Sequence, residues 1–419
     1  MIISRDAYLN KLIAHKHNRL VKIITGLRRS GKSFLLFKLF KSHLLDSGVA
    51  PSHIIEIELD DRINKWLRDP DACLQHVRKQ IVDNDMYYLL IDEVQYMAEF
   101  EDVLNSFLHI CNLDVYVTGS NSKFLSKDII TEFRGRGDEI HVYPLSFSDY
   151  YGVHPELTWE DAWNQYWKYG GLPYVATLSA EEDKVSYLQR LFKEVYVRDI
   201  VERNKVKNDM ALERLLDIIS SGIGSLTNPQ KLANSFKSLA QVSLSAATIK
   251  SYLDYIEDAF LISKAERYDI KGKKYLSTPI KYYFTDIGLR NARLNFRQQE
   301  ETHIMENIIY NELLTRGYQV DVGIVEIYEK GETGKYARRQ IEVDFVANKG
   351  ENRYYIQSAY SLPTMEKIVQ EERPLRGISD YFKKFVIVKD NILTRRDESG
   401  LITMGLKTFL LDKDSLGAV

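Results

Sequence analysis

The feature that most constrains the fold is a glycine-rich segment placed between an apolar strand and an apolar helix. Residues 26–33 read Gly-Leu-Arg-Arg-Ser-Gly-Lys-Ser, between the β-branched run VKIIT and the apolar run FLLFKLF. A loop of this kind turns tightly and presents backbone N–H groups, together with a helix N-terminus, to phosphate oxygens. The segment therefore predicts a strand–loop–helix unit that binds a nucleotide, and a chance loop before a helix is the weaker alternative.

The residue types of this loop predict individual roles. Lys32 is expected to reach the β- and γ-phosphates, and the Ser33 hydroxyl to coordinate Mg²⁺. The expected cofactors are ATP and Mg²⁺, because the chain has no NKxD-like segment to recognise guanine. The predicted nucleotide-binding residues are Gly26, Leu27, Arg28, Arg29, Ser30, Gly31, Lys32, Ser33 and Phe34.

Polar residues end two later apolar runs. The run YLLIDE ends in Asp92 and Glu93, which predicts that Asp92 holds Mg²⁺ through water and that Glu93 polarises the attacking water. The run LDVYVTGS ends in Ser120, which is predicted to hydrogen-bond the γ-phosphate or the water. A helix N-cap by Ser120 or Asn121 is the alternative for that position.

Apolar runs alternate with helical patterns over the first 150 residues. Strands are predicted at 21–27, 53–59, 87–94, 113–120 and 139–145, with helices at 32–45, 70–83, 97–111 and 121–130. Because the apolar runs are uninterrupted, we expect strands buried on both faces, in a parallel sheet covered by helices. The predicted fold class is an α/β P-loop NTPase.

The remaining chain is too long for one hydrophobic core, since domains usually run to ~100–200 residues. Apolar residues recur at helical spacing from about residue 157 to residue 220. Residues 227–290 then predict two helices followed by a hairpin, the order that a winged helix needs. The last part of the chain alternates strands and helices. We predict a P-loop ATPase domain at 1–155, a helical lid at 156–222, a winged helix at 223–295 and a second α/β domain at 296–419.

Five motifs together resemble a known family. RRSGKS, LLIDEVQ, VTGSNS, FRGRG and YPLSFSDY look like those of the AAA+-type predicted ATPases of bacteria and archaea, whose C-terminal region carries a domain of unknown function related to restriction endonucleases. The resemblance implies an ASCE-type P-loop core, a lid, a winged helix and a restriction-endonuclease-like terminal domain. It also places Arg134 and Arg136 where an arginine finger is offered to a neighbouring subunit, with a solvated loop as an equal alternative.

Two further elements allow a functional and a structural interpretation. Gly170-Gly171-Leu172-Pro173 is similar to an element that contacts adenine in related signalling ATPases, but a turn between helices is the favoured interpretation. Arg198 suits either a lid arginine that acts on phosphate or a helix-surface partner of Asp199 or Glu202.

For the predicted winged helix, contact with DNA and a protein-binding or purely structural role are equally weighted interpretations. Basic residues outnumber acidic ones over 264–281, a surplus that suits backbone phosphates, but Asp254, Glu257 and Asp258 would repel a duplex. The basic residues are Lys264, Arg267, Lys271, Lys273, Lys274 and Lys281.

The terminal domain offers a possible degenerate nuclease site at Glu306, Asp344 and Gln357. A metal-dependent nuclease of the restriction-endonuclease type needs a lysine near the attacking water, and that position holds Ala359. Lys349 and Arg353 are the close substitutes in sequence. We therefore expect no Mg²⁺-dependent DNA cleavage, and an ATP-regulated nuclease is disfavoured.

Composition sets the remaining expectations. The net charge of −2 gives no global attraction to nucleic acid. Two cysteines, Cys73 and Cys111, and the lack of a long apolar stretch predict a reduced, cytoplasmic protein outside membranes. The leading function is ATP hydrolysis coupled to the winged helix and terminal domain, with DNA, a partner protein or a second copy as partner. A nucleotide-gated switch with slow turnover is the alternative.

Overall fold

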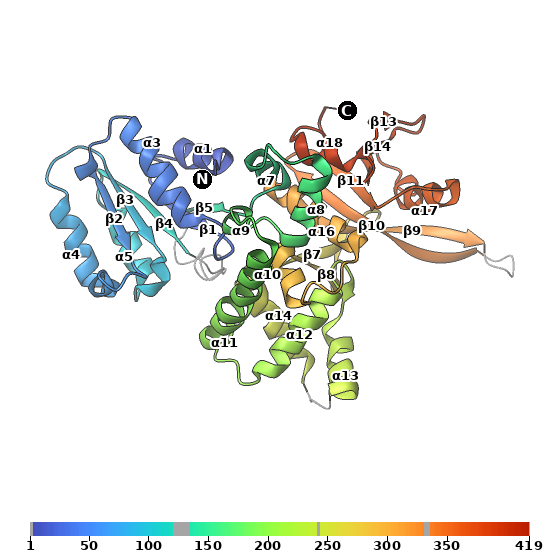
Figure 1. The fold of residues 1–419 in the computed structure, drawn as a ribbon, viewed down its shortest axis with the longest axis horizontal. Helices are drawn as coiled ribbons and strands as arrows, with labels where there is room; N and C mark the ends of the chain where they lie inside the picture. The colour runs from blue at the N-terminus through green and yellow to red at the C-terminus, as the bar shows by residue number, and fades with distance from the viewer. Residues whose placement is uncertain (1–2, 120–134, 241–243, 331–335, 419) are drawn as a thin grey trace. The chain divides into compact units, whose positions relative to one another are not determined.

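The computed structural model describes residues 3–119, 135–240, 244–330 and 336–418 (Figure 1). The chain separates into two compact units. Unit 1 comprises Met1–Pro144 with Asp258–Phe260, and unit 2 comprises Leu145–Glu257 and Leu261–Val419. The four predicted domain ranges stay a prediction. No helix in the described ranges is long and apolar enough to cross a lipid bilayer.

Unit 1 contains a five-stranded, wholly parallel sheet in the order β2-β3-β4-β1-β5. This confirms the predicted parallel sheet. The strands are β1 (Val21–Thr25), β2 (Ile54–Glu58), β3 (Tyr87–Asp92), β4 (Leu113–Thr118) and β5 (Gly137–His141). The strand that ends in Asp92 is thus separated from the strand before the glycine-rich loop by β4 alone.

Helices cover both faces of this sheet (Figure 1). Along β1, Val21 and Ile23 pack into one core, whereas Ile24 packs into the other, which explains the uninterrupted apolar run. The helices are α1 (Asp6–Ala14), a continuous helix made of α2 (Lys32–Phe34), η1 (Leu35–Phe40) and α3 (Lys41–Asp46), then α4 (Pro70–Gln80) and α5 (Phe100–Phe107), with short turns η2 (Pro51–His53), η3 (Lys65–Arg68) and η4 (Val94–Tyr96).

The connection after β3 differs from the predicted helix at 97–111. Glu93 and Glu99 both have left-handed backbones, with φ of 51° and 48°. Each residue interrupts the regular structure, so β3 ends at Asp92 and α5 begins only at Phe100. The helix predicted at 121–130 lies outside the described residues.

Unit 2 begins with helices and continues into a nine-stranded sheet. Its first helices are α7 (Phe147–Val153), α8 (Trp159–Tyr169), α9 (Pro173–Ala176), a continuous helix made of α10 (Glu181–Arg190), η6 (Leu191–Val197) and α11 (Arg198–Asn204), and α12 (Asp209–Ser221). The segment predicted as a winged helix then runs through β6 (Leu226–Thr227), α13 (Pro229–Ala240), α14 (Ala246–Asp258), β7 (Ile262–Asp269) and β8 (Lys274–Phe284).

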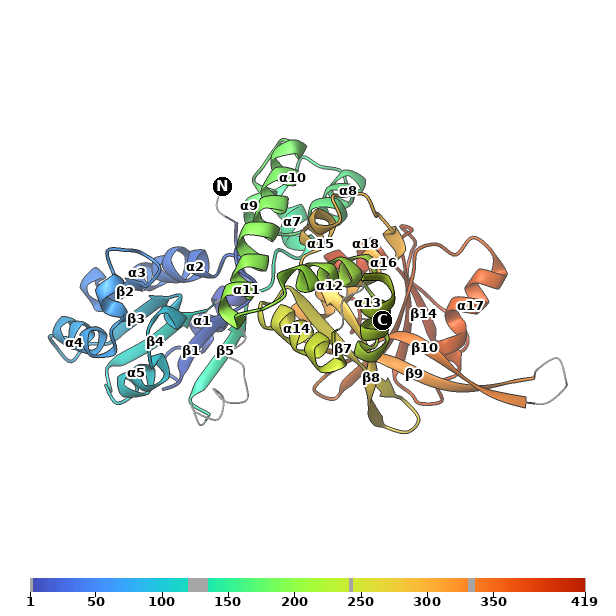
Figure 2. The same cartoon turned by 90° about the horizontal axis from the view of Figure 1, so that it is seen from below.

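The remaining strands of unit 2 join this hairpin in one sheet. Its order is β13-β14-β12-β11-β10-β9-β7-β8-β6, with β7 parallel to β9. Beyond the rest of the sheet, β9 and β10 extend as a two-stranded arm (Figure 2). The elements are α15 (Ile287–Arg293), α16 (Glu301–Thr315), β9 (Gln319–Lys330), β10 (Tyr336–Lys349), β11 (Asn352–Ala359), α17 (Met365–Arg376), β12 (Lys383–Val388), β13 (Arg395–Arg396), β14 (Leu401–Gly405) and α18 (Leu406–Leu411).

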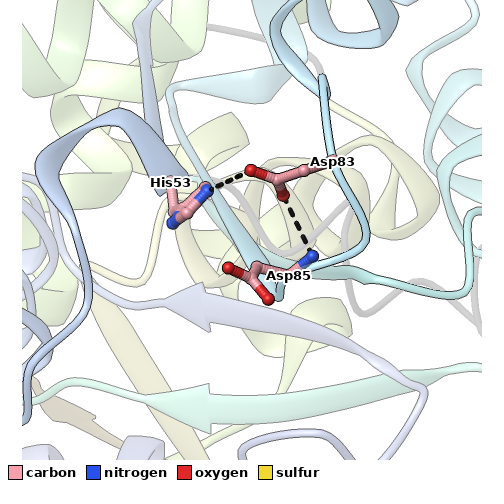
Figure 3. A group of neighbouring side chains, drawn as sticks. All are labelled: His53, Asp83 and Asp85. Carbon is pink, nitrogen blue, oxygen red and sulfur yellow. Dashed lines mark hydrogen bonds and ion pairs between the residues drawn. The ribbon is translucent and has the colours of Figure 1, made fainter.

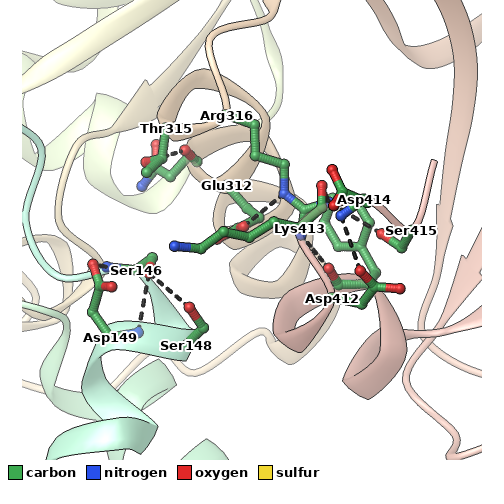
Figure 4. A network of polar contacts seen from close by, with 12 residues as sticks. Ser146, Ser148, Asp149, Glu312, Thr315, Arg316, Asp412, Lys413, Asp414 and Ser415 are labelled. Atoms are coloured by element: carbon green, nitrogen blue, oxygen red, sulfur yellow. Dashed lines mark hydrogen bonds and ion pairs between the residues drawn. The ribbon is translucent and has the colours of Figure 1, made fainter. Parts of the chain in front are cut away.

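Arg316, which follows α16, forms a buried ion pair with Glu312 and hydrogen bonds to the C-terminal segment (Figure 4). The guanidinium of Arg316 lies 2.7 Å from Glu312 and also donates to the Ser415 hydroxyl at 3.1 Å and to the carbonyl oxygen of Phe409. Burial raises the pKa of Glu312, and the charge of Arg316 opposes that shift. We interpret these contacts as structural: the two charged groups neutralise each other, and Arg316 joins α16 to the C-terminal segment.

Candidate nucleotide site

The glycine-rich loop owes its path to left-handed backbone at three residues. Gly26, Arg29 and Gly31 have φ of 134°, 68° and 99°. A Cβ at Gly26 would lie 2.2 Å from the carbonyl oxygen of Val142, so the backbones of the loop and of the segment after β5 approach too closely for any side chain. The loop therefore needs glycine where β1 ends, and Lys32 begins the following helix.

Lys32 lies inside this loop. Its side chain is buried, and Nζ donates to the carbonyl oxygens of Gly26 at 2.9 Å and Leu27 at 3.0 Å. Burial lowers the pKa of Lys32 to about 8, and the carboxylates of Glu93 and Asp92 oppose that shift. The hydroxyl of Ser30 is buried without a hydrogen-bond partner among the described residues. A buried cation beside an unsatisfied hydroxyl fits a loop that completes its hydrogen bonds with phosphate.

The two predicted metal ligands meet at the end of β3. The carboxylate of Asp92 is buried and accepts a hydrogen bond from the hydroxyl of Thr118. Burial raises the pKa of Asp92, whereas the hydroxyls of Thr118 and Ser33 favour its ionised form. A carboxylate next to a hydroxyl is the oxygen donor set that suits Mg²⁺, so Asp92 and Ser33 fit the ion.

Glu93 follows Asp92 with its backbone held by the next strand. Its N–H donates to the Thr118 hydroxyl at 3.0 Å, and its carboxylate accepts a hydrogen bond from the Gln95 amide. Thr118 thus touches both acidic residues, although the sequence directed attention to Ser120 instead. Thr118 is the last residue of β4, and this position at the carboxyl end of a strand is the sequence feature that indicates a place in the site.

Three more residues missed from the sequence lie where β1 and β5 end. The Thr25 hydroxyl donates to Glu139 at 2.6 Å and lies 3.0 Å from Nδ1 of His141. Burial, with a further contribution from the charge of Lys32, lowers the pKa of His141 to about 3. This histidine is therefore neutral at physiological pH. Only the register of two strands far apart in sequence brings these residues together.

Of the two predicted finger arginines, the structure describes only Arg136. Ser120, Asn121 and Arg134 lie outside the described residues. Arg136 is exposed, and its carbonyl oxygen accepts a hydrogen bond from Val21, the first residue of β1. The loop follows the other end of β1, about 16 Å away at the usual rise per residue. Arg136 is thus excluded from the site in its own chain.

In unit 2, the Gly170–Pro173 segment is a turn packed on its own unit. A Cβ at Gly170 would lie 2.3 Å from the Asp286 carboxylate, and one at Gly171 would lie 2.2 Å from the carbonyl oxygen of Leu145. The N–H of Gly171 donates to Asp286 at 2.8 Å. These contacts support the structural interpretation of both glycines.

Arg198 also has its structural partner. It is exposed and lies 2.6 Å from Glu202, one turn along the same helix, while Asp199 pairs with Arg203. The helix-surface interpretation is the one that these contacts support.

The possible nuclease residues converge only in part. Glu306 and Asp344 lie about Lys281, which is 2.9 Å from Glu306. Gln357 instead contacts the backbone N–H of Asp344 at 3.4 Å and Glu371 of α17 at 3.4 Å. The sequence counts Lys281 in the basic surplus that suits backbone phosphates, but its side chain is buried and paired with carboxylates.

The two close substitutes in sequence for the missing lysine have other partners. Lys349 donates to the carbonyl oxygen of Arg316 at 2.8 Å, and Arg353 donates to the Asn348 side chain at 2.7 Å. The lysine that the structure brings to Glu306 is Lys281, from a strand that precedes the predicted terminal domain, and Nδ1 of His303 lies 3.8 Å from the other oxygen of Glu306.

One further cluster of potential metal ligands lies in unit 1 (Figure 3). One ligand atom from each of His53, Asp83 and Asp85 lies within 4.8 Å of the others. His53 is already paired with Asp83 at 3.2 Å, and Asp83 accepts from the N–H of Asp85 at 3.0 Å. Both aspartates are exposed, so solvated carboxylates explain the group.

Two family models match parts of the chain. Residues 18–151 match the family described as an AAA domain, and residues 160–300 match a domain of unknown function, DUF8612. The latter match covers the predicted lid and winged helix, and not the C-terminal region where the resemblance places its domain of unknown function.

Among solved structures, Cdc6p from Pyrobaculum aerophilum aligns with 74% of this chain and 94% of its own, at 12% identity and a TM-score of 0.29. The Aeropyrum pernix ORC1 protein, solved in complex with DNA, aligns with 70% of this chain and 92% of its own, at 12% identity and a TM-score of 0.27. The family assignment does not depend on these two structures.

Two relatives match nearly the whole chain in sequence. An uncharacterized protein of Methanocaldococcus jannaschii is 28% identical over 414 residues, covering 95% of this chain and 86% of the relative. An uncharacterized protein of Haemophilus influenzae is 34% identical over 391 residues, covering 92% of this chain and 93% of the relative. The chain therefore belongs to the same family as the Haemophilus influenzae protein, and its residues 18–151 match an AAA domain.

Proposed function

We propose that the protein binds and hydrolyses ATP with Mg²⁺ at the loop of residues 26–33. The observation that carries this proposal is the convergence of Lys32, Ser33, Asp92 and Glu93 at one end of the sheet. The Ser33 hydroxyl favours the ionised form of Asp92, and the charges of Asp92 and Glu93 act on Lys32. Phosphoryl transfer to water requires a cation that binds the phosphates, ligands for the metal ion and a carboxylate that orients the water.

Nucleotide binding would change the hydrogen bonds of Lys32 and Ser30. Lys32 exchanges the carbonyl oxygens of Gly26 and Leu27 for phosphate oxygens, and the Ser30 hydroxyl gains a partner. Ser33 and Asp92 would hold Mg²⁺. When bound, the ion neutralises charge on the β- and γ-phosphates. Because Lys32 is buried, its charge acts at low dielectric and attracts phosphate more strongly than an exposed lysine would.

Glu93 is the residue we assign to the attacking water. The Gln95 amide donates to its carboxylate, and that carboxylate is the group we propose to accept a proton from the water. Thr118 fixes the backbone of Glu93 and the side chain of Asp92. Thr118 is therefore a positioning residue, which keeps the metal ligand and the proton acceptor in a constant relation.

The arginine-finger proposal requires a second copy of the chain. Arg136 leads into β5 at the end of the sheet opposite to the loop, so it acts on a nucleotide only if that nucleotide is bound by another subunit. We propose such a role for Arg134 or Arg136 in a homo-oligomer. A cation of this kind stabilises the charge that develops during phosphoryl transfer.

The segment 223–295 is proposed to be a winged helix that responds to nucleotide state. Its element order, β6, α13, α14, β7 and β8, with β8 between β7 and β6 in the sheet, supports this assignment. The turn between β7 and β8 exposes Lys271, Lys273 and Lys274. These exposed lysines favour duplex DNA as the partner, because they suit its backbone phosphates.

Turnover by the purified protein tests the proposed function. ATP hydrolysis that is lost in Lys32→Ala and in Glu93→Gln supports it. Binding of ATP without measurable hydrolysis would favour the alternative, a nucleotide-gated switch that acts through partner recognition. Stimulation of the rate by duplex DNA would tie the ATPase to the winged helix, and protein-dependent stimulation alone would assign that module to a protein partner.

A further inference from the structure

A second polar cluster lies inside unit 2, separate from the nucleotide site. Lys281 of β8 lies 2.9 Å from Glu306 of α16 and 2.6 Å from Glu342 of β10. The Tyr283 hydroxyl donates to the same oxygen of Glu306 at 2.6 Å. Less than a tenth of Lys281 and of Glu306 is exposed. A buried ammonium is thus shared between carboxylates from two other elements.

A β-bulge brings a third carboxylate to this cluster. The pairing of β10 with β9 shifts by one residue between Val343 and Val346, and an extra residue of this kind redirects a side chain. The Asp344 carboxylate accepts from the N–H of Ser358 at 2.8 Å. The Gln357 side chain accepts from the N–H of Asp344 at 3.4 Å. Side chains therefore replace ladder hydrogen bonds here, which fixes the position of Asp344.

The charges of the cluster depend on one another. Burial would lower the pKa of Lys281, but Glu306, Asp344 and Glu342 together raise it above its ordinary value. Burial, and then the charge of Glu306, raise the pKa of Asp344 well above its usual range. The Ser358 hydroxyl is more than nine-tenths buried without a partner among the described residues. The three carboxylates thus outnumber the ammonium of Lys281 and the imidazole of His303, whose Nδ1 lies 3.8 Å from Glu306.

We propose that the ammonium of Lys281 occupies this cluster in place of a divalent metal ion, so that the cluster is a cation site filled by the chain itself. Carboxylate oxygens are the donors that Mg²⁺ and Mn²⁺ prefer. The three carboxylates do not form a group whose ligand atoms all lie within 4.8 Å of one another, since the described residues contain only one such group, at His53. They surround an ammonium, and a divalent ion beside that buried charge would be strongly repelled.

This assignment also accounts for Ala359. That residue is buried in the apolar cluster with Tyr355, Leu375 and Val388. A lysine there would be buried among apolar side chains without a partner, which is costly. The positive charge comes instead from β8, and it ties the hairpin of the proposed winged helix to α16 and β10. Its role is to join these elements, because all three carboxylates that act on it belong to α16 and β10.

Removal of the ammonium tests the proposal on the full-length, nucleotide-free protein. Lys281→Met leaves Glu306 and Glu342 without their cation, and we expect this variant to gain Mn²⁺ binding with a Kd of about 10⁻⁴ to 10⁻³ M. Excess Mn²⁺ should raise its Tm by roughly 3 °C or more relative to a chelator. Wild type and the control Lys274→Met, an exposed residue of the same strand, should show neither effect. Mn²⁺ titration and thermal melting are the measurements.

Three results would overturn the proposal. The first is Mn²⁺ binding by wild type that is lost in Glu306→Gln, and the second is a folded Lys281→Met that gains no binding. The third is DNA cleavage by wild type with Mg²⁺ or Mn²⁺ that disappears in Asp344→Ala. If Lys281→Met folds only with Mn²⁺, the ion replaces the ammonium and the proposal is supported. If it folds in neither condition, Lys281→Arg decides: a folded, Mn²⁺-insensitive protein supports the proposal, and an unfolded one refutes it.

Discussion

The hydroxyl of Thr118, at the end of β4, donates a hydrogen bond to the carboxylate of Asp92, at the end of β3. The same oxygen accepts the N–H of Glu93 at 3.0 Å. One side chain on a neighbouring strand thus sets the positions of the proposed metal ligand and of the residue assigned to water. Two parallel strands in register make this possible.

Replacement of Thr118 by Val keeps the shape of the side chain and removes both hydrogen bonds. We expect ATP affinity to stay within a few fold of wild type, while kcat falls between roughly 10- and 100-fold, because the two acidic residues lose their common support. Steady-state ATPase kinetics and equilibrium ATP binding are the measurements. Thr403→Val, at a buried strand position of unit 2, is the control. An unchanged kcat in Thr118→Val would remove the positioning role.

Lys32→Ala removes the buried cation from the loop. We expect ATP affinity to fall about 10-fold or more, as for loss of a charge-assisted hydrogen bond, and turnover to be abolished. Lys38→Ala, an exposed position on the same helix, should behave as wild type. ATP binding by calorimetry and phosphate release are measured on both variants. Wild-type affinity and rate in Lys32→Ala would refute the site.

Local sequence was sufficient for the part of the site that is contiguous in the chain. The loop and the Asp92–Glu93 pair follow apolar strands, so their types and spacing predict their place. Thr118 was missed because its role depends on strand register. Lys281 was counted in the basic surplus over 264–281, whereas its charged neighbours in space belong to α16 and β10. Asp286 was missed for the same reason, since its partner Gly171 lies on a distant turn.

The raised pKa of Asp286 leads us to expect that the free energy of unfolding of unit 2 depends on pH. Burial raises its pKa to about 6, although backbone N–H groups such as that of Gly171 oppose the shift. A raised pKa in the folded state means that folding favours the protonated acid. The contribution is therefore fully present below the unfolded pKa near 3.9, and up to about 3 kcal/mol is lost as pH rises through 6.

The Asp286→Asn variant should lack this loss between pH 4 and 7.5, because its side chain does not ionise. Urea unfolding at several pH values, followed by tryptophan fluorescence, measures the difference. Trp159, Trp163 and Trp167 all lie on α8, close to the turn that Asp286 contacts. Parallel pH profiles for the variant and wild type would contradict the assignment.

The exposed lysines of the β7–β8 turn predict salt-dependent DNA binding. In a Lys271→Ala, Lys273→Ala double variant, we expect weaker binding to all duplex sequences and a salt slope reduced by about one for each phosphate that the variant no longer neutralises. Lys237→Ala, an exposed change on α13, should bind as wild type does. Fluorescence anisotropy at several salt concentrations provides the data. Binding equal to wild type in the double variant would exclude this turn as the DNA contact.

The most direct test of the central claim is the rate of ATP hydrolysis by Glu93→Gln, measured with its ATP affinity. If Glu93 orients and deprotonates the attacking water, affinity stays near wild type and hydrolysis falls by ~10² or more. Glu99→Gln, on the same connection between β3 and α5, should hydrolyse ATP at the wild-type rate. Hydrolysis at the wild-type rate in Glu93→Gln, or a loss of binding equal to the loss of rate, would contradict the proposed site.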